Sequence, residues 1–91
     1  MAVTVYVPTP YRSLTAGQAR VRVAGQHLAE AIEGLEGSYP GFRARVCEDG
    51  NLRHYVNVYV NGEEVRSLAG LQTPLKDGDE IAFVPALAGG C

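Results

Sequence analysis

The segment Tyr55–Arg66 reads YVNVYVNGEEVR and indicates a β-hairpin. In its first half, three valines alternate with polar or aromatic residues, which is the period of a strand with one buried face. Asn61-Gly62 follows, and this dipeptide is a strong hairpin signal because both central turn positions require a positive φ. We therefore predict a strand over residues 55–60 and a short returning arm over residues 64–66.

Two further strands are predicted upstream of this hairpin. Residues 3–8 alternate between valine and other residues until Pro8, which cannot donate a hydrogen bond to a sheet. Residues 19–23 alternate in the same way, and the run 16–18 between the two segments has the composition of a turn. The two segments therefore predict an antiparallel pair.

The apolar period changes to that of a helix after Gly25. Four apolar residues recur at helical spacing: Leu28, Ala31, Ile32 and Leu35. Gly37 and Pro40 are typical helix terminators. Three glutamates fall on the other faces of this helix and are expected to be solvated: Glu30, Glu33 and Glu36. The stretch 42–53 shows no regular period and predicts irregular structure.

The last predicted strand covers residues 80–84, after the turn Asp77-Gly78-Asp79 and before Pro85. The order is then strand, strand, helix, strand, short strand, strand. A single helix offers one apolar face, and one mixed sheet must cover it. We therefore predict an α+β fold of the β-grasp, or ubiquitin-like, type over residues 1–85, with one main helix packed on the sheet.

Residues 86–91, Ala-Leu-Ala-Gly-Gly-Cys, are expected to form a flexible C-terminal tail. Gly89 and Gly90 carry no side chain, so a thin backbone can enter a narrow channel of another enzyme. ATP can convert a carboxylate into an acyl-adenylate, and a sulfur donor can then form a thiocarboxylate. The reacting group would be the α-carboxylate of Gly90, and no catalytic side chain is needed. Taken alone, the tail is equally compatible with a flexible end that has no role.

Composition argues against several other classes of protein. The chain has 91 residues and a net charge of −2, and its arginines are scattered, so no basic face for nucleic acid is expected. No apolar run approaches the roughly 20 residues of a membrane span. The N-terminus shows no signal-peptide pattern, so we expect a cytoplasmic protein. A chain this short builds one modest core, which disfavours a large enclosed active site.

The sequence contains two cysteines, Cys47 and Cys91, which are too few for a disulfide framework or a four-cysteine iron–sulfur cluster. Cys47 is expected to be a small buried hydrophobic residue rather than a reactive thiol. His27 is expected on the surface near the helix start, and neither His27 nor His54 belongs to a set of residues with metal-ligand spacing. No metal site is predicted.

Two segments carry a resemblance to a known family. The hairpin YVNVYVNGEEVR and the segment LKDGDEIAFVPALAGG, residues 75–90, resemble the MoaD/ThiS family of ubiquitin-like sulfur carriers. The likeness covers nearly the whole chain. Within the family it is closest to the CysO type, a carrier used in cysteine biosynthesis.

This resemblance implies a carrier rather than an enzyme. An E1-like enzyme would use ATP to adenylate Gly90, and sulfur transfer would then give the thiocarboxylate. A PLP-dependent cysteine synthase would take the sulfur, and a JAMM-type zinc peptidase would release the cysteine left on the terminal glycine. The partners would recognise Leu87, Ala88 and Gly89 in the tail. The carrier itself would hold no cofactor.

The chain departs from the family pattern at Cys91, because members usually end at the second glycine. A JAMM-type peptidase would remove Cys91 by cleaving the Gly90–Cys91 bond, and this is the favoured interpretation because a cysteine-loaded carrier contains the same bond. Cys91 is alternatively an added residue, or its thiol acts itself in metal or disulfide chemistry. An exposed thiol is prone to oxidation, which argues against its long persistence.

Partner docking is expected on the sheet face that points away from the helix. Tyr59, Ala82 and Val84 would lie there if their strand neighbours face the core, with Arg20 and Arg22 at the rim. An apolar patch close to the tail would serve as a docking surface. The alternative is a set of ordinary scattered surface hydrophobic residues.

Three other functions remain open at this point. Within the family, the sulfur could serve molybdopterin or thiamin synthesis instead. A ubiquitin-like protein modifier would join Gly90 to lysines of other proteins. An interaction domain with an inert tail would be unaffected by loss of residues 88–91.

Overall fold

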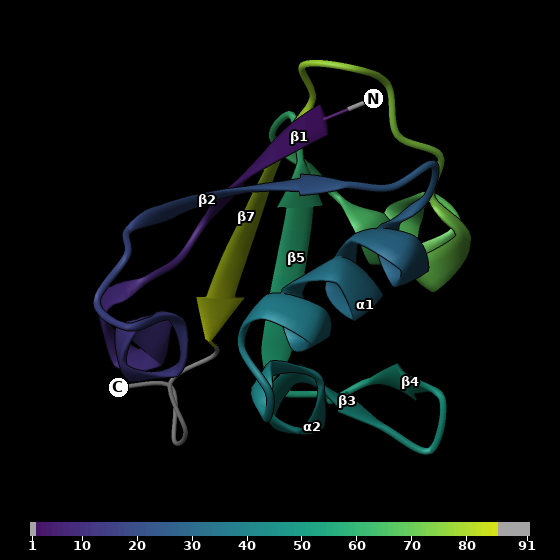
Figure 1. Ribbon diagram of the computed structural model, residues 1–91. Coiled ribbons are helices and arrows are strands. Elements are labelled where there is room, and N and C mark those ends of the chain that lie inside the picture. The colour runs from purple at the N-terminus through teal and green to yellow at the C-terminus, as the bar shows by residue number, and fades with distance from the viewer. Residues whose placement is uncertain (1, 86–91) are drawn as a thin grey trace.

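The computed structural model describes residues 2–85, and these residues form a mixed sheet with a helix packed across one face (Figure 1). The strands of the main sheet lie side by side in the order β2 (Arg20–Ala24), β1 (Ala2–Tyr6), β7 (Glu80–Pro85), β5 (Val56–Val60) and β6 (Glu63–Glu64). Only β1 and β7 run parallel, and the other neighbours are antiparallel. The predicted β-grasp fold is confirmed.

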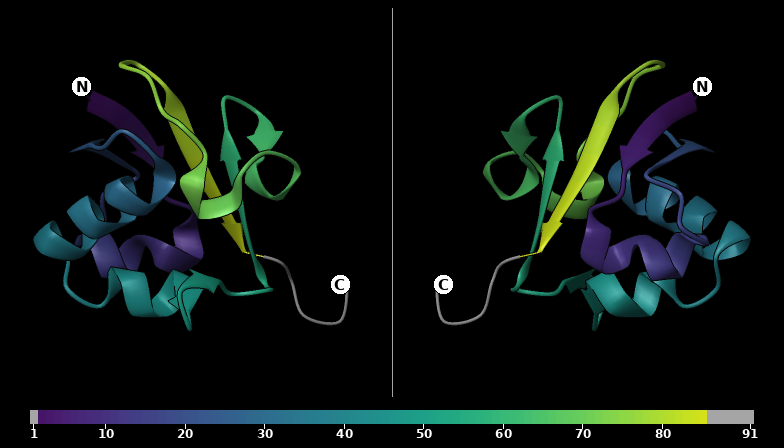
Figure 2. Two further views of the ribbon diagram at one scale, coloured as in Figure 1. Left: turned by 90° about the vertical axis from the view of Figure 1, so that its right-hand side faces the viewer. Right: turned by 90° about the vertical axis from the view of Figure 1, so that its left-hand side faces the viewer.

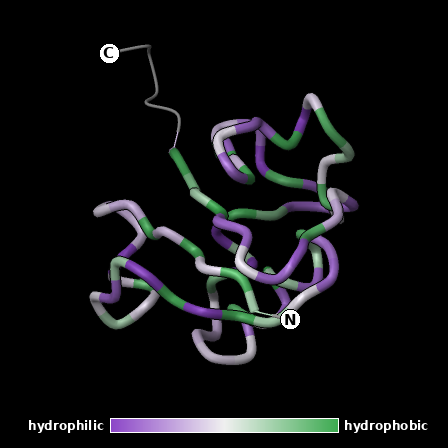
Figure 3. The backbone as a smooth tube through the Cα atoms, turned by 90° about the horizontal axis from the view of Figure 1, so that it is seen from above, coloured by the Kyte–Doolittle hydropathy of each residue, from purple (hydrophilic) through white to green (hydrophobic). Residues whose placement is uncertain are grey.

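The helix α1 (Leu28–Ser38) buries its predicted apolar stripe completely against the sheet. The inward-facing residues of the strands pack against this stripe. Their alternation with outward-facing hydrophilic residues can be followed in Figure 3. Val58 and Ile81 are fully buried and Phe83 nearly so, which confirms the predicted orientation of β5 and β7. Phe83 also meets Phe42 edge to face, with 5.3 Å between the ring centroids.

The turns that join the strands follow the predicted chemistry. Asn61 and Gly62 have φ of 51° and 87°, as a turn with two left-handed positions requires. Asp79 then ties this hairpin to the start of β7, since its carboxylate accepts hydrogen bonds from the Asn61 side chain at 3.0 Å and from the Lys76 backbone at 2.8 Å. These hydrogen bonds lower the pKa of Asp79 below its ordinary value.

The stretch 42–53 is more regular than predicted. It contains the short helix α2 (Phe42–Val46) and a two-stranded hairpin of β3 (Cys47–Glu48) and β4 (Asn51–Leu52). Glu36 stabilises the start of α2 by accepting hydrogen bonds from the backbone N–H groups of Gly41 and Arg43. Each element in the segment is too short for a periodic pattern, and a side-chain contact from the end of α1 stabilises the start of α2.

A second difference lies between the first two strands. They pair as predicted, but a 3₁₀ segment, η1 (Thr9–Thr15), joins them. Pro10 is compatible with the first turn of a helical segment, and Tyr11 and Thr15 are buried beneath it. Two more 3₁₀ turns, η2 (Val65–Ser67) and η3 (Gly70–Gln72), form the connector that leads to β7.

His27 lies at the helix start as predicted, partly exposed, and it has a capping role that the sequence did not indicate. It is the N-cap of α1, and its Nδ1 accepts a hydrogen bond from the backbone N–H of Glu30 at 3.4 Å. The carboxylate of Glu30 reaches back to the backbone N–H of Gln26 at 2.7 Å. The helix start is therefore stabilised by two side-chain-to-backbone hydrogen bonds, one accepted by His27 and one by Glu30.

Gly25 allows the chain to pass close to α1, which leads to a first prediction. A Cβ at Gly25 would lie 2.8 Å from the backbone nitrogen of Ala31. Gly25→Ala is therefore expected to lower the free energy of unfolding by about 1–3 kcal/mol, measured by urea denaturation. Gly37→Ala is the control: its Cβ would meet nothing within 4 Å, and it should raise that free energy by about 0.5–1 kcal/mol. Equal midpoints for the two variants would contradict the close approach.

Candidate functional site

The sheet face opposite α1 carries no covering element among residues 2–85 (Figure 2). Strand register places one row of side chains across this open face: Arg20, Tyr6, Ala82, Tyr59 and Glu64. The row has two aromatic rings on either side of the small Ala82, with a charged residue at each end. We call this the open face.

The predicted docking residues come together on this face. Tyr59 and Ala82 are cross-strand partners and are partly exposed, and Val84 follows on β7 with 41% of its surface exposed. Phe83, between Ala82 and Val84, points to the core. The last residues of β7 are therefore hydrophobic on the core side and on the open face (Figure 3). The three residues thus form one continuous surface rather than scattered ones.

Tyr6 is an additional member of the open face that the sequence analysis did not single out. It lies beside Ala82 in the sheet, and its hydroxyl donates a hydrogen bond to Glu80 at 3.1 Å. The alternation of valines in residues 3–7 already placed Tyr6 outward. Its pairing with β7 was not visible in the sequence, because the two parallel strands lie at opposite ends of the chain.

Arg66 holds the start of β5, which lies beside the end of β7. Pro85 pairs with Val56 at the start of β5. The guanidinium of Arg66 donates hydrogen bonds to the backbone carbonyls of Arg53 and Val56 at 2.9 and 2.8 Å, and to the Asn57 side chain at 2.9 Å. Arg66 therefore fixes the start of β5, the strand that pairs with the end of β7. Sequence reasoning had assigned it only to the return arm of the hairpin.

The predicted reacting and recognition residues, Leu87, Ala88, Gly89, Gly90 and Cys91, lie outside the described residues. What the structure does establish is the place from which this segment starts. It follows Pro85, at the end of β7 that borders both η1 and the start of β5 (Figure 1). The open face and the base of the tail are thus adjacent.

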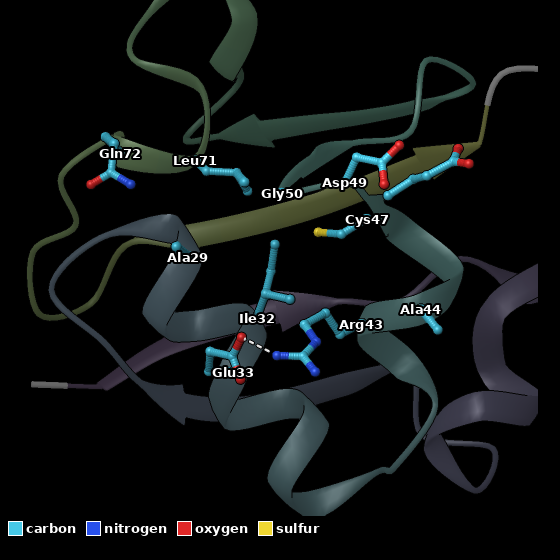
Figure 4. A pocket seen from close by; sticks show the side chains of 11 residues that line it. Ala29, Ile32, Glu33, Arg43, Ala44, Cys47, Asp49, Gly50, Leu71 and Gln72 are labelled. Atoms are coloured by element: carbon cyan, nitrogen blue, oxygen red, sulfur yellow. Dashed lines mark hydrogen bonds and ion pairs between the residues drawn. The ribbon is translucent and has the colours of Figure 1, made fainter.

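A separate hollow of about 410 Å³ lies on the other side of the molecule, between α1, α2 and the β3–β4 hairpin (Figure 4). Cys47 lines it together with the ion pair between Arg43 and Glu33, whose atoms lie 2.6 Å apart. Burial raises the pKa of the Cys47 thiol above its ordinary value and outweighs the opposing charges of Arg43 and Arg53. The half-buried thiol packs against the core and is protonated at neutral pH.

Two other features are absent from the part of the chain that the structure describes. Across residues 2–85, no group of three or more histidine, cysteine or acidic side chains is arranged to hold a metal ion. His54 instead stacks edge to face on Tyr55, with 5.4 Å between ring centroids. Within the same residues, none of the helices has the length and apolar character to cross a membrane.

Comparison with known proteins connects this geometry to a family. The ThiS family model matches residues 5–90. The sulfur carrier protein CysO of Mycobacterium tuberculosis is 43% identical over 93 residues, which cover 99% of this chain and 100% of the relative. Small archaeal modifier protein 3 of Haloferax volcanii is 41% identical over 63 residues, covering 69% of this chain and 68% of the relative.

A solved structure agrees with these matches. The carrier in the crystal structure of the Amycolatopsis orientalis BexX/CysO complex superposes with a TM-score of 0.93 and is 41% identical, covering 97% of this chain and 99% of that chain. The likeness therefore extends over the sheet, the helix and the open face together. With its β-grasp fold and its match through residue 90, this chain belongs to the ThiS family of small ubiquitin-like carriers.

Proposed function

We propose that this chain is a sulfur carrier that serves cysteine biosynthesis in the cytoplasm. The observation that carries the proposal is the family match, which runs through Gly90 and stops before Cys91. The likeness to the CysO carrier over almost the full chain favours the cysteine route over molybdopterin or thiamin synthesis.

The proposed chemistry takes place at the Gly90 carboxylate once the bond to Cys91 has been hydrolysed. An E1-like enzyme lets this carboxylate attack the α-phosphate of ATP, which releases pyrophosphate and leaves an acyl-adenylate. Sulfide then attacks the carbonyl carbon and displaces AMP, which gives the thiocarboxylate. The carrier contributes no catalytic side chain, so its own residues only position the tail and bind the partners.

Two further partners complete the proposed cycle. On a PLP-dependent synthase, the thiocarboxylate sulfur displaces the leaving group of an activated serine and forms a thioester. An S-to-N acyl shift then leaves cysteine joined to Gly90 by an amide bond. A JAMM-type zinc peptidase hydrolyses the Gly90–cysteine bond, and the same peptidase removes Cys91 from the new chain. The open face supports this proposal, because Tyr59, Ala82 and Val84 offer an apolar docking surface next to the tail.

The proposal is tested by the intact mass of the untagged protein purified from its native cytoplasm. The expected species has lost Cys91, and a fraction of it has one oxygen replaced by sulfur. If every molecule from growing cells keeps Cys91 and an ordinary carboxylate, the carrier function is wrong.

A protein modifier is the second candidate function, and the likeness to the archaeal modifier protein favours it over an inert domain. In that case Gly90 would form amide bonds with lysines of other proteins. A ladder of larger conjugates in cell extract that disappears in a Gly90→Val variant would support this alternative. Thiocarboxylate without conjugates would exclude it.

A further inference from the structure

A cleft opens on the sheet beside the base of the tail, where β1 leaves β7. The two strands pair only from Thr4 to Tyr6, and the chain then turns away at Pro8 into η1. The last residues of β7 are therefore not covered by β1 on this edge (Figure 2). The cleft measures about 390 Å³ and is lined by Tyr6, Val7, Pro8, Arg12, Ala19, Arg20, Ala82 and Phe83. We call it the tail notch.

Arg12 and Arg20 are the charged residues of the tail notch, and no acidic residue lines it. Nε of Arg12 donates a hydrogen bond to the carbonyl of Val7 at 3.0 Å, which holds the guanidinium at the cleft. Arg20 extends from β2 at the end of the row that contains Tyr6. Among residues 2–85, neither arginine forms an ion pair. The notch thus holds two positive charges with no carboxylate to balance them.

Three of the other arginines in the described part of the chain behave differently, whereas Arg22 and Arg45 also form no ion pair there. Arg43, Arg53 and Arg66 each lie within 3.1 Å of a glutamate oxygen. Glu80, the acidic residue near Tyr6, accepts a hydrogen bond from the tyrosine hydroxyl. It is the first residue of β7 and lies further from the tail than Ala82 and Phe83, which line the notch. Arg22 lies opposite Thr4, two residue pairs further along β2, and does not line the notch. The two arginines share a face of β2, as the sequence predicted, but only Arg20 lines the notch.

We propose that the tail notch receives a carboxylate-bearing loop of the enzyme that activates the tail. This inference rests on the proposed carrier function. Charge complementarity selects an acidic occupant, and the apolar lining from Pro8, Ala82 and Phe83 selects a small apolar side chain beside the carboxylate. The activating enzyme is the partner because every version of the carrier pathway needs it, whereas the sulfur acceptor differs between versions.

The position of the notch explains what this contact accomplishes. It adjoins the residues of β7 that lead into the tail and is continuous with the open face through Tyr6 and Ala82. A partner that holds the tail in its active site and covers the open face must pass over the notch. An acidic side chain in it fixes the carrier's orientation, since a charged pair sets the register of an interface.

The test measures ATP–pyrophosphate exchange by the activating enzyme of the same cells, as a function of carrier concentration. Arg20→Glu is expected to raise KM about tenfold and leave kcat unchanged, because a charge at an interface rim acts on encounter and affinity. Its KM should also depend less on salt than that of the wild-type carrier. Lys76→Glu is the matched control, with the same change of charge at an exposed site outside the notch, and is expected to keep KM within about twofold.

Equal effects of the two substitutions would overturn the inference, since they would reflect net charge alone. Arg12→Gln provides a second variant that removes a charge from the notch, and it should also raise KM. Thermal unfolding of each variant verifies that the fold is retained. A variant that has lost its fold is replaced by Arg20→Gln, for which an unchanged KM would equally overturn the proposal.

A second measurement separates failure of the notch from failure of the carrier function. The isotope-labelled protein is titrated with acetyl-Glu-Ala-Glu-amide and, as control, with acetyl-Gln-Ala-Gln-amide, while amide NMR shifts are recorded. Saturable shifts confined to the notch, seen only with the acidic peptide and lost in Arg20→Glu, would support the notch even if no enzyme adenylates the chain. Shifts spread over all basic residues, or no shifts, would overturn it.

Discussion

A chain that ends at Gly89 is expected to lose at least about 100-fold in the rate of carrier-dependent ATP–pyrophosphate exchange, compared with a chain that ends at Gly90. Removing one residue moves the terminal carboxylate back by roughly 3.5 Å along an extended backbone. Attack on the α-phosphate requires the reacting atoms to be about 3–3.5 Å apart in aligned geometry. A shift of one residue therefore removes the carboxylate from its reacting position.

The matched control for this truncation is the chain that ends at Gly90, without Cys91. It should be adenylated by the activating enzyme without any peptidase present. The chain that retains Cys91 should be inactive until the peptidase is added. Equal rates for the chains ending at Gly89 and Gly90 would contradict the assignment of Gly90 as the reacting residue, and activity of the uncleaved chain would contradict the role of Cys91 as a removable cap.

The second large effect is expected at the centre of the open face. Ala82 lies between Tyr6 and Tyr59, so a long charged side chain there would separate any partner surface from both rings. Ala82→Arg is expected to raise KM of the activating enzyme for the carrier about 100-fold, as for other central interface positions. Titration of the activating enzyme with each variant, followed by pyrophosphate exchange, measures this effect.

Ala24→Arg is the control for Ala82→Arg. Ala24 ends β2 and faces the same side of the sheet as Arg20 and Arg22, but it is exposed at the corner far from Pro85. The same substitution at that corner should leave KM within about twofold. Both arginines can extend into solvent, so both variants should unfold at temperatures close to that of the wild type. A similar loss in both would mean that docking does not centre on Ala82.

Local pattern was enough to predict most elements of this fold. The helical stripe from Leu28 to Leu35 and the hairpin at Asn61-Gly62 were found correctly, because each depends on the spacing or backbone freedom of neighbouring residues. The helix α2 was missed, because its start is stabilised by Glu36, a contact made between elements rather than within one. The 3₁₀ segment before Gly17 was missed for a similar reason, since buried Tyr11 and Thr15 anchor it.

Some residues of the candidate site could likewise be predicted from the local sequence pattern, whereas others depend on contacts between distant residues. Tyr59, Ala82 and Val84 were predicted together from strand alternation alone, and the register confirms that they share a face. Arg66 was not predicted to hold the start of β5 beside the base of the tail, because its hydrogen bonds reach back to Arg53 and Val56 across the hairpin. Guanidinium contacts of this kind depend on the folded path of the chain and have no signature in a local sequence window.

The sequence by itself determined the class of fold, the outward or inward direction of the residues in the predicted strands, and the tail in which Gly90 is the proposed reacting group. Those properties follow from periodicity and from the lack of side chains on glycine, which are local. Only the tertiary structure decided that Tyr6 joins Ala82 and Tyr59, and that Arg12 and Arg20 meet beside the base of the tail. These juxtapositions arise because β1 and β7, from opposite ends of the chain, pair in parallel for only three residue pairs and then separate.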